Sequence, residues 1–301
     1  MLRGIYIVAQ DIPLARKMYQ TLEPYHAMIY FVPEAPQAYA RAGLEDRSRG
    51  YFASRAAPLG PVSAEVVIAT FYNFSPALVH SVIPAAWQRA TPEALIVARI
   101  EAVDLALRRM LDDGPGSDSH DIGSPAVAEA ADLAREASTA CTLQGRALYA
   151  GHAALPWPDA PHLALWHAIT LLREYRGDSH IAALLVEGFS GIEALITYTA
   201  AGNASPSGLR KTRGWSEEEW AAAEARLRER GWLDADGALT AEGRARRTGI
   251  EERTDELARA PWDHLGADRC ARLREIVRPL SKAIVDAGTF PASMQPKRAD
   301  A

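Results

Sequence analysis

Apolar positions recur every three or four residues along most of this chain, which is the spacing that one face of an α-helix requires. Thr91-Pro92-Glu93 is the clearest helix start, because a capping hydroxyl precedes a proline and an acid that suits the helix dipole. The pattern predicts helices over 13–22, 34–42, 63–71, 76–87, 91–111, 124–142, 163–175, 179–187, 190–201, 216–231 and from 240 onward. The chain is therefore predicted to be mainly α-helical.

The second half of the chain predicts the element order of a winged helix-turn-helix domain. Gly188 is predicted to turn the chain between two short helices, and Asp236-Gly237 to form the tight turn of a small β-hairpin. Pro61–Ser75 aligns without gaps on Arg176–Ser190, so we expect the first half to repeat this arrangement. The fold class that follows is two winged-helix-like halves, a tandem winged helix-turn-helix with small β-hairpin wings.

A polar, turn-rich stretch at 112–123, DDGPGSDSHDIG, is the predicted linker between the halves. A chain of 301 residues is long enough for two domains of ordinary size. We expect an N-terminal winged-helix-like half over residues 1–118 and a C-terminal winged-helix half with a C-terminal helix over residues 119–301. That C-terminal helix, 268–287, is expected to pack across a two-fold axis, which predicts a homodimer.

The charge balance changes the expected partners. The chain has 38 Asp and Glu against 33 Lys and Arg, a formal charge of −5, which argues against a strong nucleic-acid or anionic-membrane binder. Cys141 and Cys270 lie far apart in sequence and form no metal or redox motif. The apolar run Met1–Ala9 is ended by Asp11 and Pro13 and carries no cleavage pattern, so a cytoplasmic protein without a membrane partner is expected.

The segment LWHAITLLREYRGDSHIAAL, residues 165–184, places many ionisable side chains in what otherwise has the pattern of a core helix. Burying such groups is costly unless they pair or do chemistry. On a helix His167, Thr170 and Glu174 share one face, and a histidine beside a carboxylate is the pairing that a general base needs. The alternative is a paired helix at a domain junction, in which Arg173 and Glu174 are ordinary salt-bridge partners.

Arg176-Gly177-Asp178-Ser179-His180 is predicted to be a turn followed by a helix start. Asp178 or Ser179 would cap that helix, and His180 would lie in its first turn, where the helix dipole lowers the pKa and favours the neutral ring. A neutral ring can act as a base or a metal ligand, but the spacing matches no known zinc pattern. We therefore expect no metal site and no cofactor.

Aromatic residues in the first half accompany a predicted anion-binding arginine. Tyr51 and Arg55 are four residues apart, and an arginine among aromatic rings can bind a carboxylate or phosphate or stack on a planar ligand, although such rings are more often core. The predicted ligand-binding residues are His26, Tyr51, Arg55, Phe71, Tyr72, Trp166, Arg173 and Arg176. The predicted catalytic residues are His167 as the base, Glu174 as its orienting partner, His180 and Asp178.

Five segments of the chain carry a family resemblance. They are LEPYHAMIYFVPEA, GYFASRAAPLGPVSAEVVIATFYNFSP, LWHAITLLREYRGDSHIAALL, RGWSEEEW and LTAEGR. They resemble the recurring blocks of a large, uncharacterised actinobacterial helix-turn-helix (MarR-like) family, over about Leu22–Pro291. In that family the third block usually has histidine where this chain has Tyr175. The resemblance implies the fold and a bacterial cytosolic setting, and it assigns no reaction.

Three functions remain open at this stage. The first is a small-molecule protein of specialised metabolism or self-resistance, either an enzyme or a sequestering binder, that uses a cleft between the two halves. If it is an enzyme, we expect acid/base chemistry such as hydrolysis, isomerisation or cyclisation. The buried polar cluster, the aromatic residues and the acidic balance favour this hypothesis.

The second function is a DNA-binding transcriptional regulator of MarR-like type. Residues 179–201 contain no Lys or Arg, and the predicted wing is acidic, whereas a DNA reader normally carries cations there. Only the segments 210–213 and 244–247 are expected to offer cations, so nucleic acid is a disfavoured partner. The third function, a base-excising DNA-repair enzyme on tandem winged helices, rests on fold analogy alone.

Overall fold

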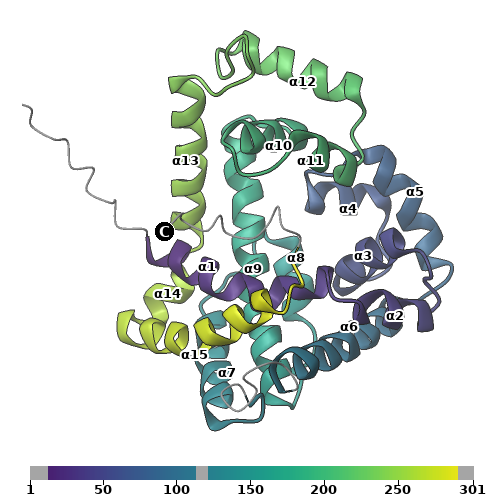
Figure 1. Cartoon of the computed structure of the whole chain (residues 1–301), viewed down its shortest axis with the longest axis vertical. Coiled ribbons are helices and arrows are strands. Elements are labelled where there is room, and N and C mark those ends of the chain that lie inside the picture. Colours follow the sequence, from purple (N-terminus) through teal and green to yellow (C-terminus); the bar gives the residue numbers. More distant parts are fainter. Residues whose placement is uncertain (1–12, 113–120, 291–301) are drawn as a thin grey trace, which may run out of the picture.

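The computed structural model describes residues 13–112 and 121–290, and this part of the chain is almost entirely helical (Figure 1), so the prediction of a mainly α fold is confirmed. The predicted apolar run at Met1–Ala9 and the predicted domain boundary at 118/119 lie outside the described residues. The helices are α1 (Leu14–Ala27), α2 (Glu34–Arg41), α3 (Arg47–Ala56), α4 (Ala64–Phe71), α5 (Pro76–Trp87), α6 (Pro92–Leu107), α7 (Pro125–Ser138), α8 (Ala147–Ala153), α9 (Pro161–Val186), α10 (Gly191–Ala200), α11 (Pro206–Arg213), α12 (Glu217–Glu229), α13 (Ala241–Leu257), α14 (Ala260–Leu265) and α15 (Ala267–Asp286).

Helix α9 is the central element, and it runs 26 residues without the break predicted at Gly177-Asp178. In Figure 1 it stands upright in the middle of the molecule, and α7, α8, α1 and α13 pack along it. A glycine inside a helix costs only about 1 kcal/mol relative to alanine, which the packing along both ends of α9 offsets. Asp178 and Ser179 therefore cap no helix start in α9, and His180 lies well inside the helix; these predictions are wrong.

The apolar core joins segments from both ends of the chain. The largest cluster combines the buried faces of α1, α2, α6, α7 and α15 with the first half of α9, including Met18, Leu107, Ala134, Ile169 and Val277. It therefore contains residues from both sides of the predicted linker. The apolar face of α15, which was expected to pack across a two-fold axis, lies against α1 and α7 of the same chain.

A second apolar cluster lies at the C-terminal end of α9. It joins the end of α9 to α10, α12 and α13, with Leu195, Trp220, Leu227 and Ile250 at its centre. A third cluster holds α3, α4, α5 and α8 together. Loop 72–75, between α4 and α5, links these two clusters, because the Tyr72 hydroxyl donates a hydrogen bond to the carbonyl of Phe189.

The predicted β-hairpin wings are wrong for the described residues. At the predicted second wing the chain forms a single antiparallel bridge between Leu233 and Leu239, and the described part of the first half has no strand. The tight turn itself is present, since the Asp234 carboxylate accepts the backbone N–H groups of Asp236 and Ala238. Thr240 then caps α13 at once, which leaves no residues to extend the ladder. The tandem winged-helix arrangement is therefore not supported.

None of the described helices is by itself long and apolar enough to cross a membrane; α9 and α10 meet those criteria only when taken together, with a bend of 96° between them.

Candidate functional site

Helix α9 supplies most of a buried cluster of ionisable side chains. The cluster also receives one side chain from each of four other helices, so its members come together only in the folded chain. We call it the buried cluster, and it consists of His26 (α1), Arg55 (α3), Arg99 (α6), His152 (α8), and His167, Arg173 and Glu174 (α9).

Glu174 is the only carboxylate of the buried cluster, and its side chain is 1% exposed. Its Oε2 accepts a hydrogen bond from Nη1 of Arg173 at 2.9 Å, and Nη2 of Arg55 lies 3.5 Å away. Burial raises the pKa of Glu174, but the neighbouring guanidinium groups of Arg173 and Arg55 outweigh burial and hold the pKa well below its usual range. The carboxylate is therefore ionised, as an ion-pair partner must be.

His26 is held by a chain of hydrogen bonds that fixes its tautomer. The Thr170 hydroxyl donates to the carbonyl of Trp166 at 2.8 Å, so it can only accept from Nδ1–H of His26, which lies 2.9 Å away. Nε2 of His26 then accepts from the Tyr30 hydroxyl at 3.0 Å. Burial lowers the pKa of His26 well below its usual value, which agrees with a neutral ring.

His152 and His167 have no such partners. Each side chain is 2% exposed, and Nε2 of each ring has no hydrogen-bond partner among the described residues. Burial, followed by the charge of Arg99, lowers the pKa of His152 to about 3 and that of His167 to about 4. His167 lies edge-on to Trp157 at 4.8 Å and makes no hydrogen bond to Glu174. The predicted base–carboxylate pair is not formed, since seven residues of helix separate the two by about 10 Å along the axis.

Several buried polar atoms of this cluster have no hydrogen-bond partner. Each such atom costs about 1–3 kcal/mol, and folded proteins keep only a few per 100 residues. Within the described residues the unpartnered atoms of the buried cluster are Arg55 Nε, Arg99 Nε, His152 Nε2, His167 Nε2 and Glu174 Oε1. Other such atoms belong to Arg16, Arg176 and Asp255, which form ion pairs between α1, α9 and α13.

The aromatic residues predicted for the ligand site divide between two places. Arg55 lies over the ring of Phe71 at 4.3 Å, and Tyr51 packs edge-on to Tyr30 at 5.4 Å, so both rings border the buried cluster. Trp166 stacks on His26 at 5.9 Å. Tyr72 lies outside the cluster, at the loop that contacts α10.

Three further predicted residues lie away from the buried cluster. Asp178 accepts the backbone N–H of Tyr149 at the start of α8, and burial raises its pKa to about 6. His180 shares a hydrogen bond with Thr254 of α13 at 3.0 Å, and burial lowers its pKa to about 4. Arg176 has a nitrogen 2.7 Å from a carboxylate oxygen of Asp255, also on α13.

Sequence reasoning missed His152 and Arg99. Both lie on helices whose other inward positions are apolar, and Arg99 interrupts the run Ala94–Ile100 in the middle of α6. A single arginine inside an apolar helix face was the available signal, because a buried cation needs partners from elsewhere in the fold. The short helix α8, which carries His152, had no comparable signal.

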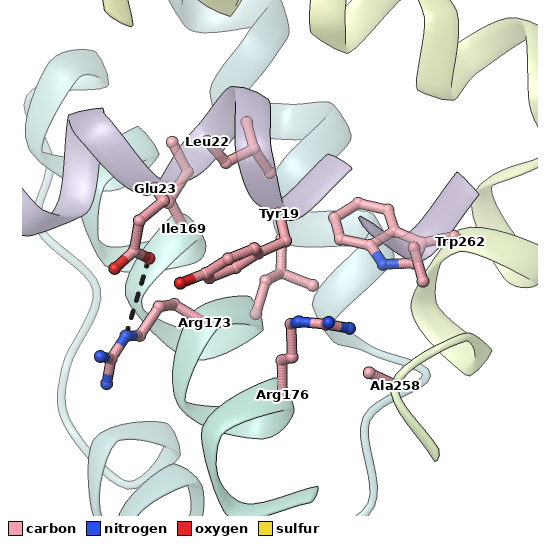
Figure 2. Close-up of a pocket in the computed structure, with 10 residues that line it drawn as sticks. Tyr19, Leu22, Glu23, Ile169, Arg173, Arg176, Ala258 and Trp262 are labelled. Carbon is pink, nitrogen blue, oxygen red and sulfur yellow. Dashed lines mark ion pairs between the residues drawn. The ribbon is translucent and has the colours of Figure 1, made fainter. Parts of the chain in front are cut away.

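An open pocket lies beside the buried cluster, between α1, α9 and the start of α14 (Figure 2). It encloses about 310 Å³, which includes its open mouth, and of this only about 20 Å³ admits a water-sized molecule. Figure 2 shows Tyr19 at its centre, with Glu23 and Arg173 on one side and Trp262 on the other. Arg173 contacts both Glu23 in the pocket and Glu174 in the buried cluster, so its guanidinium lies between the pocket and the buried cluster.

No group of three or more His, Cys, Asp or Glu side chains within residues 13–112 and 121–290 is arranged to hold a metal ion.

Helix α11 is followed by a turn at Gly214 and then by α12. The sequence pattern predicted no helix between 201 and 216, so α11 was not foreseen. Gly214 has φ +73°, and a Cβ there would lie 2.8 Å from Cβ of Leu78, so the turn is closely packed against α5. Ser216 and Glu219 form a capping box at the start of α12.

Two arginines lie over one tryptophan beside the bridged loop. Arg230 and Arg246 lie over the ring of Trp232 at 5.0 and 5.6 Å, and Arg228 donates to the carbonyl of Asp234 in the bridged loop. We call the following residues the arginine group: Arg226, Arg228 and Arg230 of α12 and its C-terminal end, and Arg244 and Arg246 of α13.

A family model described as a helix-turn-helix family matches residues 15–291, so this chain belongs to that helix-turn-helix family. Neither a curated protein nor a solved structure matches the chain. The family match establishes this class of protein, while a MarR-like character and an actinobacterial origin stay predictions.

Proposed function

We propose that this protein is a DNA-binding regulator that contacts the phosphate backbone through the arginine group. The observation that carries the proposal is the convergence of five arginines on the end of α12, the bridged loop and the start of α13. The second helix of a helix-turn-helix and the loop after it are the elements that approach DNA in this class of protein. The family match supports the same conclusion.

This proposal reverses the order of the sequence-based hypotheses, and the reason is the fold. The sequence suggested two separate basic segments, 210–213 and 244–247. In the structure Arg210 pairs with Glu217 and Arg213 lies over the ring of Phe74 at 4.6 Å, which leaves Lys211 as the exposed cation of the first segment without an ion pair among the described residues. The second joins three arginines of α12 that were not counted, and together they form the arginine group.

The arginine group remains available to phosphate although several of its members contact carboxylates. Arg226, Arg230 and Arg246 are between 39% and 48% exposed and lie 3.2–3.6 Å from oxygens of Glu193 and Glu187. The exposed part of each guanidinium can contact a phosphate while the pair with the carboxylate is kept, which matters because Glu193 is only 1% exposed and would be costly to leave unpaired. The exposed Glu217, Glu218 and Glu219 at the start of α12 oppose DNA, and we expect backbone contacts to dominate over base contacts.

Fluorescence anisotropy with a labelled 30-base-pair duplex at low salt tests this function. The double variant Arg228→Ala/Arg230→Ala is expected to lose about tenfold in affinity, because two charge-assisted phosphate contacts are removed. Arg272→Ala is the matched control, since Arg272 is similarly exposed but lies on α15. Equal affinity of the double variant and the wild type would contradict the proposal.

The second candidate is the binding of a small molecule in the buried cluster, as expected for a protein of specialised metabolism or self-resistance. The specific observation in its favour is the set of five unpartnered polar atoms around Glu174 and Arg99. A regulator that responds to such a molecule would combine both functions. Native mass spectrometry at low salt tests it: a discrete added mass that is absent from Arg55→Met supports binding, and a bare protein from every preparation opposes it.

A further inference from the structure

Asp255 is a buried carboxylate that holds the last turn of α13 against two other helices. The residue is 5% exposed. Its Oδ2 lies 2.6 Å from a guanidinium nitrogen of Arg16 in α1, and its Oδ1 lies 2.7 Å from one of Arg176 in α9. Neither oxygen accepts an aligned hydrogen bond from the described residues. The charge of Asp255 is therefore what joins the three helices.

Neighbouring contacts hold the same end of α13. The Thr254 hydroxyl donates to the carbonyl of Ile250 at 2.7 Å, so it can only accept from Nδ1–H of His180, which lies 3.0 Å away in α9. Nη2 of Arg146 donates to the carbonyl of Leu257 at 3.3 Å. Figure 1 shows this end of α13 near α1, while the other end meets the connection from α12. The C-terminal end of α13 is thus fixed by polar contacts to elements from both halves of the chain.

The N-terminal end of α13 carries Arg244 and Arg246 of the arginine group. Arg244 precedes Asp255 by 11 residues, which is about 16 Å of helix. A tilt of about 10° at Asp255 would move Arg244 by about 3 Å, which is more than a hydrogen bond to phosphate tolerates. The placement of these two arginines therefore depends on how α13 is held at Asp255.

We infer that Asp255 is a positioning residue for DNA binding, which acts through α13 and contacts no nucleic acid itself. The inference rests on the proposed function, because it concerns the arginine group. The ion pairs with Arg16 and Arg176 keep α13 at one angle to α9, so its arginines do not have to be ordered when DNA binds. Such preorganisation raises affinity without adding a contact.

Duplex binding, measured by fluorescence anisotropy with the 30-base-pair duplex, tests the inference. Asp255→Asn keeps the shape of the side chain and removes its charge, so we expect about tenfold weaker binding, as when two phosphate contacts are lost. Asp178→Ala is the matched control, because Asp178 is a similarly buried carboxylate that contacts the start of α8 and not α13. Unchanged affinity of Asp255→Asn would overturn the inference.

A double-mutant cycle separates positioning from a general loss of stability. Arg246→Ala should weaken binding about threefold in the wild type and much less in Asp255→Asn, because Arg246 is no longer held at a phosphate in that background. Arg228→Ala, on α12, should weaken binding by the same factor in both backgrounds. If Arg246→Ala also has the same effect in both, Asp255 does not act through α13 and the inference fails.

Arg16→Gln takes the place of Asp255→Asn if the latter does not fold. The Arg16 side chain is 29% exposed, and its loss leaves the ion pair of Asp255 with Arg176 intact. We expect about threefold weaker duplex binding from this partial release of α13. Wild-type affinity in Arg16→Gln would count against the inference in the same way.

A distance measurement without DNA distinguishes failure of the inference from failure of the proposed function. Spin labels at Val97→Cys in α6 and Ala245→Cys in α13, both exposed positions, report the orientation of α13 in a Cys141→Ser background. Double electron–electron resonance should give a broader distance distribution in Asp255→Asn than in the wild type. A wild type that binds the duplex, with the same distribution in both proteins, would refute the inference alone. A wild type that binds no duplex would refute the proposed function and the inference with it.

Discussion

The carboxylate of Asp178, in the middle of α9, accepts a hydrogen bond from the backbone N–H of Tyr149 at 2.9 Å and so caps the start of α8. The two residues are 29 positions apart in sequence. Helix α8 has no capping side chain of its own, because Arg146 occupies its N-cap position. The contact fixes α8, and with it His152, against the central helix.

Two substitutions of Asp178 should separate its hydrogen bond from its charge. Asp178→Ala removes a buried cap, so we expect a loss of about 1–2 kcal/mol in the free energy of unfolding. Asp178→Asn keeps an acceptor and removes a charge that burial disfavours, since the pKa of Asp178 is raised to about 6. At pH 7 we therefore expect Asp178→Asn to be about 1–3 kcal/mol more stable than the wild type. Urea unfolding measures both, and an Asn variant as unstable as the Ala variant would refute the charge argument.

Acid should destabilise this protein through its buried histidines. The pKa of His167 falls from 6.5 in the unfolded chain to about 4 in the folded chain, so the unfolded state binds the extra proton between these values. The stability contributed by the neutral ring is complete above pH 6.5 and is lost as the pH falls towards 4, by about 3 kcal/mol. His167→Gln should flatten this part of the stability profile.

The control for that profile is an exposed histidine. His80 is half exposed, so His80→Gln should leave the dependence of stability on pH unchanged. Urea unfolding at half-unit steps from pH 7.5 to pH 4 measures both variants. If His167→Gln keeps the slope of the wild type, His167 is not a buried neutral ring.

The ion pairs of Glu174 should be strongly coupled. Glu174→Gln leaves Arg55 without an anion and Arg173 with Glu23 alone, in a low-dielectric surrounding, so we expect a loss of about 3–5 kcal/mol in the free energy of unfolding. In the Glu174→Gln background, Arg55→Met should lower the free energy of unfolding much less than it does in the wild type, because the ion pair is already broken. The exposed pair of Arg41 and Glu101 should show a coupling below about 1 kcal/mol. If the losses in the free energy of unfolding from Glu174→Gln and Arg55→Met simply add in the double variant, the two side chains do not form the ion pair described above.

A single methyl group should disturb the contact between loop 72–75 and α10. A Cβ at Gly191 would lie 2.0 Å from the carbonyl oxygen of Tyr72, so Gly191→Ala must displace the loop. We expect a loss of about 2 kcal/mol or more. Gly249→Ala is the matched control: no atom lies within 4 Å of its Cβ position in α13, and it should stabilise by about 0.4–1 kcal/mol. If Gly191→Ala and Gly249→Ala change the free energy of unfolding equally, the loop at Tyr72 does not pack closely against Gly191.

Local signals in the sequence predicted helix starts well and long-range partners poorly. The side chains of Thr91, Ser124, Ser190, Ser216 and Thr240 each cap the helix that follows, and sequence reasoning can find them because the backbone N–H that donates to each cap lies only three residues away. Asp178 looked like another cap, yet its partner comes from α8. The hairpin turn at Asp236-Gly237 was recognised, but the length of the ladder depends on where α13 begins.

The buried cluster was predicted in part for the same reason. Residues 165–184 contain three of its members, His167, Arg173 and Glu174, so the residue types alone marked the segment. Arg99 and His152 come from separate helices, and no local pattern connects them with α9. Arg244 and Arg246 were expected to offer cations, but the three arginines of α12 and its C-terminal end were not counted, because no local pattern in the sequence connects them with α13.

The central claim is that the arginine group binds the phosphate backbone, and the most direct measurement is the salt dependence of duplex binding. Affinity for a 30-base-pair duplex is measured by anisotropy between 50 and 200 mM salt. Three to five phosphate contacts predict a slope of about −3 to −4.5 in log K against log salt, and Arg228→Ala should reduce the magnitude by about 1. Binding that is undetectable at 50 mM salt, or a slope near zero, would contradict the account.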